Sequence, residues 1–310
     1  MVRYILGRVG AMALTLFVIL TLAFLTVRLM PGSVYDDPDL PPAVQEALEG
    51  RLHLGEPPLR QYGYFLRGVV LEGDWGTSVK LEPGVPTFRV LTRRIPVSLG
   101  INLLALVLAL PLGIMTGTAA ALGQGKRSGR ALSLAVSVSI AVPSFVVAAL
   151  LQYLLGFKLG LFPLVYRPGN IASLVLPVLA LALGPAATVT RYVRGELTAL
   201  IHADFMILAR AKGLSRRAAL LRHGLRSAGV TLVTVISPMV AGLLGGSLVV
   251  EGIFAIPGVG GIMVDAINAR DHALTVAALI FYSAVSLTTL LLADVTYGLI
   301  DPRIRMGGAA

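Results

Sequence analysis

Six long stretches of this sequence contain no Asp, Glu, Lys or Arg, and each is long enough to cross the hydrocarbon core of a bilayer. A helix needs about 20 residues for that distance. In lipid, every backbone N–H and C=O group must be paired within the chain, so continuous apolar runs fold as helices. The predicted spans are Val9–Val27, Ile95–Gly125, Ala131–Phe157, Pro168–Thr190, Ser227–Val250 and Ala273–Ala293.

Composition supports this all-α polytopic membrane fold. Only 14% of the 310 residues are charged and 56% are hydrophobic, whereas soluble domains carry about 25% charged residues. The first run also permits a signal peptide, but it is long for a signal core and no Ala-x-Ala pattern follows Met30. The chain has no Cys, so disulfides and Cys-based metal sites are excluded.

The distribution of basic residues predicts the orientation. With the N-terminus inside, fifteen Lys and Arg fall in inside segments and three in the two short outside loops. Cytoplasmic loops carry such an excess, so both termini are predicted to be cytoplasmic. The net charge of +10 then reflects topology rather than nucleic-acid binding. The predicted division is a first helix in 1–30, an extracytoplasmic cap in 31–94, a five-helix core in 95–303 and a tail in 304–310.

Proline and glycine mark special positions in this scheme. Within the cap, Ala43–Leu52 and Leu59–Leu71 have weak helical character. Two pairs of glycines, Gly113 with Gly117 and Gly242 with Gly246, are spaced so that helix backbones can approach closely. Five prolines predict kinks within the spans, namely Pro111, Pro143, Pro177, Pro185 and Pro238.

The sequence lacks the patterns of common catalytic sites. There is no HExxH, Gly-x-Ser-x-Gly or Walker A motif. The four histidines lie outside the predicted spans, and none pairs with another at metal-ligand spacing. We therefore expect neither enzyme activity nor a metal site. Glu251 and Asp294 lie at membrane depth, where ionised groups are costly; they either line a pathway or sit at the interface with local partners.

The inside loop from Arg191 to Arg226 has a pattern of its own. Asp204 is predicted to cap a helix over Phe205–Lys212. Phe205, Leu208 and Ala209 then share one face. Gly213 is predicted to stop this helix and Ser215 to cap a second one. Helices this short need a docking partner, which is either another protein or, for a plain basic loop, lipid headgroups.

Several motifs in this chain resemble one family of membrane proteins. The loop sequence Asp204-Phe-Met-Ile-Leu-Ala-Arg-Ala-Lys-Gly-Leu-Ser215 is similar to the cytoplasmic coupling loop of ABC importer permeases of the oligopeptide/dipeptide subfamily, although Ile207 and Leu208 depart from its consensus. Gly73-Asp-Trp-Gly-Thr-Ser78 resembles the subfamily's outer-loop motif. Further similarities are Arg94–Ser98, Val142–Phe145, Glu251–Gly260 and the tail Asp301–Arg305.

The resemblance implies a type I ABC importer transmembrane fold of six helices in a bacterial or archaeal cytoplasmic membrane. The implied partners are a second permease subunit, two cytoplasmic ATPase subunits that hold ATP and Mg, and an extracytoplasmic solute-binding protein. This chain itself would bind no cofactor. The implied ATPase-coupling residues are Asp204, Phe205, Leu208, Ala209, Arg210, Ala211, Lys212, Gly213, Leu214, Ser215 and Arg222.

The resemblance also implies roles outside the loop. Pathway or gate candidates are Pro143, Ser144, Glu251 and Asp294, and candidates facing the binding protein are Asp74, Trp75, Pro257, Asp265 and Asp271. The implied substrates are di- or oligopeptides, with nickel, glutathione or another small solute as alternatives. A self-contained secondary transporter usually carries polar groups near mid-membrane; here only Asn102 and Gln152 stand out there.

Overall fold

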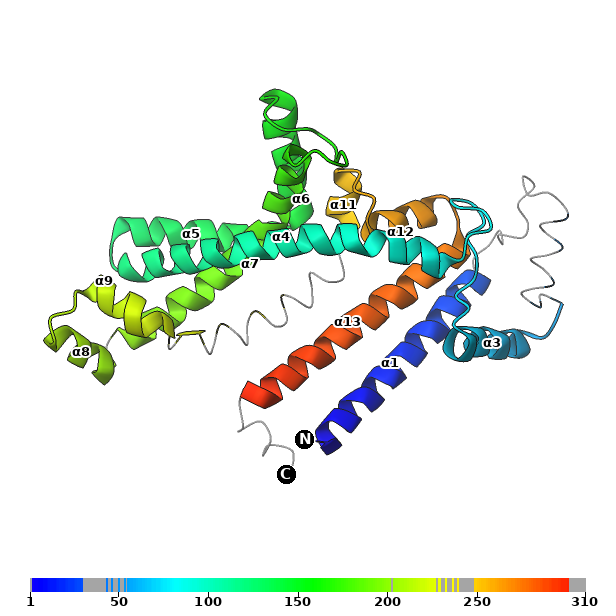
Figure 1. Cartoon of the computed structure of the whole chain (residues 1–310), viewed down its shortest axis with the longest axis horizontal. Coiled ribbons are helices and arrows are strands. Elements are labelled where there is room, and N and C mark those ends of the chain that lie inside the picture. Colours follow the sequence, from blue (N-terminus) through cyan, green and yellow to red (C-terminus); the bar gives the residue numbers. More distant parts are fainter. Residues whose placement is uncertain are drawn as a thin grey trace. The chain divides into compact units, whose positions relative to one another are not determined.

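The computed structural model describes residues 2–29, 55–201, 203–226 and 248–300, with a few single residues between 43 and 53 and between 228 and 239. The described chain is helical, as predicted, and its elements are shown in Figure 1. The elements are α1 (Val2–Leu29), α3 (Pro58–Arg67), η2 (Gly68–Glu72), α4 (Thr87–Leu122), α5 (Arg127–Ala141), α6 (Ser144–Leu151), η3 (Gln152–Lys158), α7 (Ala172–Leu200), α8 (Asp204–Ala211), α9 (Arg216–Ala219), η4 (Leu220–Gly224), α11 (Leu248–Ile253), α12 (Val259–Asn268) and α13 (His272–Ile300).

Among the described residues, four helices are long and apolar enough to cross a membrane. They are α1, α4, α7 and α13, and the bent pair of α5 with α6 and η3 would make a fifth. Most of the predicted span Ser227–Val250 lies outside the described residues, together with Pro238, Gly242 and Gly246. The count of six spans and the position of the termini therefore stay predictions.

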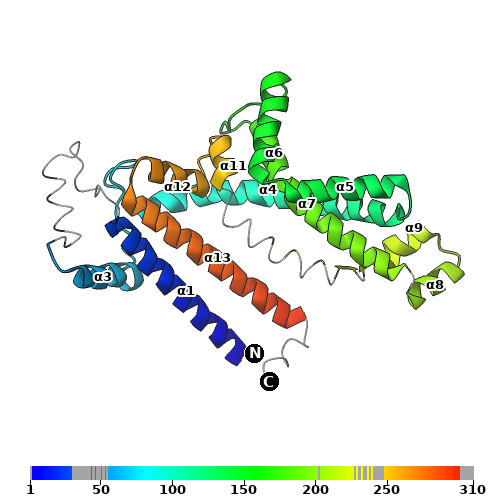
Figure 2. The ribbon, with the colours of Figure 1, turned by 180° about the vertical axis from the view of Figure 1, so that it is seen from behind.

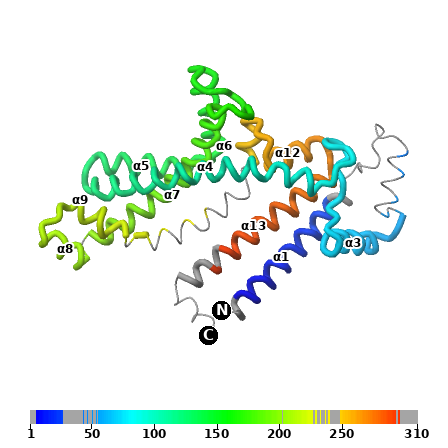
Figure 3. The backbone as a smooth tube through the Cα atoms, in the orientation of Figure 1, coloured from blue at the N-terminus to red at the C-terminus, as the bar shows by residue number. Residues whose placement is uncertain are grey.

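The predicted third span is broken. The segments Arg127–Ala141 and Ser144–Lys158 are bent by 103° relative to each other, and the turn between α5 and α6 can be followed in Figure 3. Val142 is extended, with φ −82° and ψ 123°. Proline offers no N–H and disfavours the α conformation in the residue before it. The kink predicted at Pro143 is therefore confirmed, and it is sharp enough that the predicted span Ala131–Phe157 forms two separate helical segments.

Two long helices run past their predicted ends. α4 begins at Thr87 rather than Ile95, and α7 continues from the predicted end at Thr190 to Leu200. The 36 residues of α4 correspond to about 54 Å of helix, against roughly 30 Å of hydrocarbon. A charge-free stretch predicts only the part of a helix that lies in the hydrocarbon core. The helix itself can continue beyond that part, because charged side chains are solvated there. α7 therefore extends into the basic loop that follows it.

The chain divides into two compact units, Met1–Pro96 with Pro257–Thr288, and Val97–Ile256 with Thr289–Ala310. In the first unit, the start of α4 packs against α12 and α13 through buried residues such as Leu91, Ile262 and Leu274. The second unit has two apolar clusters. One surrounds Leu176 and Phe254, and the other joins α7 to the loop helices through Leu197 and Leu220.

Gly113 and Gly117 form the close helix contact that their spacing predicts, and the partner is α7. A Cβ atom on Gly113 would lie 2.5 Å from Val189 Cβ, and one on Gly117 would lie 2.7 Å from Val193 Cβ. The hydroxyl oxygens of Thr116 and Thr190 add a 2.5 Å hydrogen bond between the two helices. Small residues thus let the backbones of α4 and α7 approach.

Replacement of Gly113 by valine should therefore weaken the packing of α4 on α7. Overpacking of a tight contact costs about 1–3 kcal/mol, so the melting temperature of the purified protein in detergent should fall. A Cβ atom added to Gly100, on the same helix, would have no neighbouring atom within 4 Å, and Gly100→Val is the matched control. Equal melting temperatures of the two variants would contradict the contact.

Candidate functional site

The basic loop after α7 folds back on the end of that helix. α8, α9 and η4 follow α7 in order and bury Met206, Ala219 and Leu220 against Leu197. Gly224 lies so close that an added Cβ would be 3.0 Å from Leu197 Cδ2. The two short helices are thus held by packing within the chain, which compensates for their low intrinsic stability.

The first short helix begins one residue earlier than predicted. Ala203 occupies the N-cap position and makes no side-chain capping bond, so the prediction that Asp204 caps the helix is wrong. Asp204 is instead the first helical residue, and α8 ends at Ala211 rather than Lys212. A carboxylate in the first turn is still favourable there, because it lies near the positive end of the helix dipole.

Gly213 ends this helix as predicted, in a well-defined geometry. Its φ is +92°, which glycine adopts without steric cost. The Gly213 N–H donates to the Arg210 carbonyl at 2.9 Å, and the Leu214 N–H donates to the Ala209 carbonyl at 3.2 Å. This pair of bonds is the Schellman motif. Leu214 also packs on the apolar cluster that contains Ala209, so the motif fixes the direction of the chain.

The second short helix is capped as predicted. The Ser215 hydroxyl accepts a hydrogen bond from the Ala218 N–H at 3.2 Å, the usual role of serine at an N-cap. The helix continues from α9 into η4, so that the loop reads helix, glycine turn, helix. The local sequence therefore determines both the stop and the restart.

The predicted apolar face of α8 is partly buried within the chain and partly exposed. Ala209 turns inward with Met206, while Phe205 and Leu208 are exposed to 43% and 56%, and Ile207 to 57%. Around them the loop exposes mostly cations and small residues, namely Arg210, Ala211, Lys212, Gly213, Ser215, Arg216, Arg217 and Arg222. This site therefore has an exposed apolar surface bordered by basic residues, which a partner could contact.

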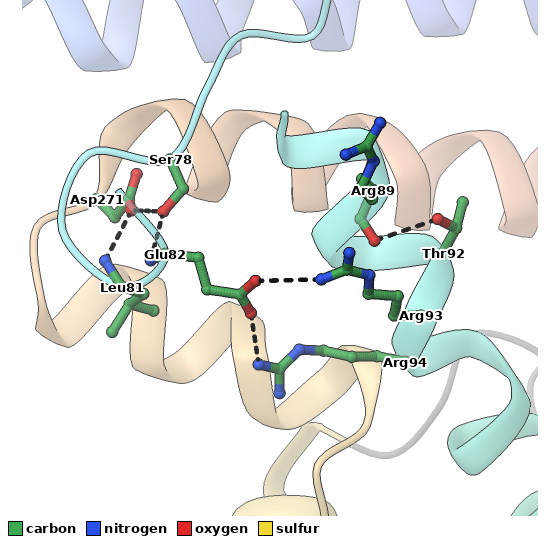
Figure 4. Close-up of polar contacts among 8 residues, drawn as sticks. All are labelled: Ser78, Leu81, Glu82, Arg89, Thr92, Arg93, Arg94 and Asp271. Carbon is green, nitrogen blue, oxygen red and sulfur yellow. Dashed lines mark hydrogen bonds and ion pairs between the residues drawn. The ribbon is translucent and has the colours of Figure 1, made fainter. Parts of the chain in front are cut away.

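The segment that the sequence assigns to an outer cap contacts Asp271 in a second organised site, shown in Figure 4. One carboxylate oxygen of Asp271 accepts a hydrogen bond from the Ser78 hydroxyl at 2.5 Å and bonds from the N–H groups of Val79, Lys80 and Leu81. Its other oxygen accepts from the Leu274 N–H at 3.2 Å. Asp271 therefore joins the turn 78–81 to the start of α13 and lies in the interior, unlike the prediction that it faces a partner.

The motif Gly73–Ser78 explains how this turn is formed. Gly73 and Gly76 have φ values of +65° and +84°, and the Asp74 carboxylate accepts from the Gly76 N–H at 2.9 Å. Close by, the Glu82 carboxylate pairs with Arg94 at 3.1 Å and with Arg93 at 4.0 Å (Figure 4). The motif thus stabilises the turn and positions Ser78 for its hydrogen bond with Asp271.

Three of the four remaining residues predicted to face the binding protein are exposed. Asp74, Pro257 and Asp265 are exposed. Trp75 is half-buried, and its ring meets that of Phe88 edge to face with centroids 5.4 Å apart. All four lie in the first compact unit, and the three exposed side chains reach the surface of that unit.

The predicted pathway residues lie in different surroundings. Pro143 and Ser144 lie at the break between α5 and α6, whereas Glu251 is buried in α11. Asp294 lies in α13, but its side chain is outside the described residues. Pro143, Ser144 and Glu251 all belong to the second compact unit. Their role in a translocation pathway stays a prediction.

Sequence reasoning missed the role of Gln152 as a link between helices. Its amide Nε2 donates to the Leu164 carbonyl at 2.8 Å and to the Ile253 carbonyl at 3.0 Å. The Tyr166 N–H donates to the Phe254 carbonyl at 2.8 Å beside it. A lone amide within an apolar stretch is the signal that could have indicated this link, since a polar side chain with few polar neighbours in sequence needs partners from elsewhere in the chain.

The sequence of this chain is similar to those of known membrane transport proteins. Residues 109–306 match the family described as the binding-protein-dependent transport system inner membrane component. The dipeptide transport system permease protein DppB of Lactococcus lactis is 37% identical over 99% of this chain and 100% of its own length. DppB of Bacillus subtilis is 38% identical over 99% of both chains. The oligopeptide permease OppB of Escherichia coli is 33% identical over 98% of this chain and 100% of its own.

A solved structure shares the fold. A chain of the inward-facing MetNI methionine ABC transporter superposes with a TM-score of 0.53 at 16% identity, over 69% of this chain and 97% of that one. The type I importer fold that the sequence predicts is thereby confirmed.

Proposed function

Because this chain belongs to the family of inner membrane components of binding-protein-dependent transport systems, we propose that it forms half of an importer's translocation pathway and couples ATP hydrolysis by partner subunits to alternating access. Its partners are a second permease subunit, two cytoplasmic ATPases that carry ATP and Mg, and a binding protein outside. The chain itself has no catalytic role and binds no cofactor.

The exposed apolar face of α8 is the observation that carries the coupling proposal. Phe205, Ile207 and Leu208 are each more than two-fifths exposed although α8 packs on its own chain. A short helix that follows the charged end of α7 is predicted to lie in the cytoplasm, where such a surface favours contact with protein. The surrounding Arg210, Lys212 and Arg216 favour an acidic margin on the ATPase that receives this face.

The rigid connection of this face to α7 makes the coupling physically possible. Met206, Leu220 and Leu197 share one apolar cluster, so a displacement of α8 by closing ATPases acts on α7. Work requires that the ATPases bind the loop differently in two states of the transporter. The tight contact between α7 and α4 then passes the movement to a second membrane helix.

Relatives support peptides as the substrate. Proteins that are 37% and 38% identical are named as dipeptide permeases, and one that is 33% identical as an oligopeptide permease. We therefore favour di- or oligopeptides over nickel, glutathione or another small solute. An ATPase-dependent mechanism also sets this protein apart from a self-contained secondary transporter, which would not need the α8 surface.

Replacement of Leu208 by glutamate tests the docking of α8. The carboxylate would be desolvated on contact with an apolar groove, and loss of one such contact costs about 1–3 kcal/mol. Co-purification of the ATPase subunits with the tagged chain should fall, and so should ATPase activity stimulated by the binding protein. Gln124→Glu, at an exposed residue of the turn between α4 and α5, is the control and should keep both. Undiminished co-purification of Leu208→Glu would refute the docking site.

A further inference from the structure

A short amphipathic helix, α3 with its continuation η2, is attached to the outer end of α1. The Tyr62 hydroxyl lies 2.5 Å from the Thr21 hydroxyl, and the rings of Tyr62 and Phe65 lie 5.3 and 5.5 Å from that of Phe24. Figure 2 shows α3 beside α1, near one end of that helix. Thr21 and Phe24 belong to the last turns of the apolar segment Ile5–Thr26, so these contacts hold α3 at the level where the hydrocarbon core ends.

One flank of this helix is apolar and uncovered in the described chain. Leu59, Leu66 and Val70 are spaced i, i+7 and i+11, which brings them onto one side of a helix. Leu59 is 86% exposed and Val70 is 64% exposed, although Leu66 is half-buried. This stripe adjoins the one that packs on α1 through Tyr62 and Phe65, so the two together make a continuous apolar surface.

The adjoining side of the same helix carries two exposed arginines, together with Tyr64 and Leu71, which are 43% and 78% exposed. The side chains of Arg60 and Arg67 are 72% and 70% exposed, and they pair with Glu56 at 3.7 Å and Glu72 at 2.9 Å. An apolar flank with arginines beside it is typical of helices that lie in the membrane–water interface, where the arginine side chain covers apolar surface and its charged end reaches the headgroups.

The surface of α1 indicates what covers the apolar flank. Only 11% of its most apolar window is buried within the chain, and Leu14 and Leu22 are 65% and 57% exposed. In a membrane-spanning helix these side chains meet acyl chains. Because α3 is bound to the last turns of the same helix, the membrane environment of α1 extends to the flank of α3.

We propose that α3 and η2 lie in the outer membrane–water interface, with the Leu59–Leu66–Val70 stripe against phospholipid acyl chains and Arg60 and Arg67 at the headgroups. The outer cap would then be anchored to the lipid surface as well as to the transmembrane helices. This anchor goes beyond the transport function and does not depend on the nature of the substrate.

Spin labelling tests the position of this helix, because the chain has no cysteine of its own. Leu59→Cys, Val70→Cys and Arg60→Cys, each in the full chain assembled with its partner subunits, would carry a nitroxide in nanodiscs of phosphatidylethanolamine and phosphatidylglycerol. Collisions with O2, which enters lipid, are compared with those of a water-soluble Ni chelate. Phe17→Cys on α1 and Asp265→Cys on α12, both exposed in the structure, give the lipid and water references.

The labels at 59 and 70 should collide more with O2 than with the Ni chelate, as at 17, and the ratio should reverse at 60, as at 265. If 59 and 70 behave like 265, the helix lies in water and the proposal is wrong. Low collision rates with both reagents would place the stripe against a protein subunit, which also overturns it. Melting temperatures equal to that of the unlabelled protein show that each variant is folded.

Discussion

Replacement of Asp271 by alanine is expected to cause a large loss of stability in the first compact unit, because it frees the turn 78–81 from the start of α13. The side chain is fully buried, and its carboxylate accepts from the Ser78 hydroxyl and from backbone N–H groups of Val79, Lys80 and Leu81. A buried donor left without a partner costs about 1–3 kcal/mol; the Ser78 hydroxyl is such a donor, whereas the three N–H groups are part-buried and lose less. Because these donors form one network, the combined cost is several kcal/mol and is not a simple sum.

The loss should be visible both globally and locally. The melting temperature of Asp271→Ala should fall, and amide hydrogen exchange at residues 79–81 should accelerate well before exchange in α4 or α7. Asp271→Asn keeps one oxygen acceptor and should give an intermediate loss. Asp265→Ala, an exposed residue on the neighbouring α12, is the matched control and should change neither. Unaltered exchange at 79–81 in Asp271→Ala would show that the carboxylate does not hold this turn.

Replacement of Gly213 by valine should uncouple ATP hydrolysis from transport. At a φ of +92° a β-branched residue adds strain of about 1–3 kcal/mol, which corresponds to roughly a 5- to 150-fold weakening of an interaction that needs this geometry. The Schellman motif would open and the direction between α8 and α9 would change. Uptake of a labelled dipeptide into proteoliposomes of the full complex should fall by about that factor.

A strain-matched control separates coupling from a general effect on folding. Gly160 has a φ of +62° and, like Gly213, has nothing within 4 Å of an added Cβ, but it lies in the segment between η3 and α7. Gly160→Val should therefore carry similar strain without loss of ATPase stimulation by the binding protein. If Gly213→Val keeps normal uptake, or if both variants lose it equally, the helix–glycine–helix geometry is not what couples the subunits.

Asp271 and Gly213 lie in different compact units of the chain. The structural role of Gly213 could be predicted from the sequence, whereas that of Asp271 could not. The motif around Ser78 is visible in the sequence, but Asp271 lies 193 residues further along, and nothing local links the two. For Gly213 the local sequence sufficed, because a helix stop depends on neighbouring backbone bonds. Long-range polar pairs depend on which helices pack together, which is decided by the whole core.

In the basic loop, too, some features could be predicted from the local sequence and others could not. Its stop at Gly213 and its cap at Ser215 were predictable from the residues themselves, since each is satisfied within a few positions. The start at Asp204, with Ala203 as the N-cap, was not predictable, because a carboxylate is favourable both as a cap and in the first turn. Which side of α8 faces inward was also undetermined, since Met206 and Leu208 are both apolar and only packing on Leu197 distinguishes them.

By itself the sequence determined that this protein is a helical membrane protein of the importer permease family, where its charge-free segments lie, and where its loop turns. The family follows from the resemblance of several sequence motifs to those of importer permeases. The other properties follow from hydropathy, from charge and from local backbone chemistry, which act over one or two helical turns. Only the tertiary structure decided that the third span breaks at Pro143 while α7 continues through Pro177 and Pro185, that Gly113 meets Val189, and that Asp271 is buried beneath the cap. The reason is physical: the free energy of a kink, a close contact or a buried carboxylate depends on neighbours that are distant in sequence, and only the packed chain supplies them.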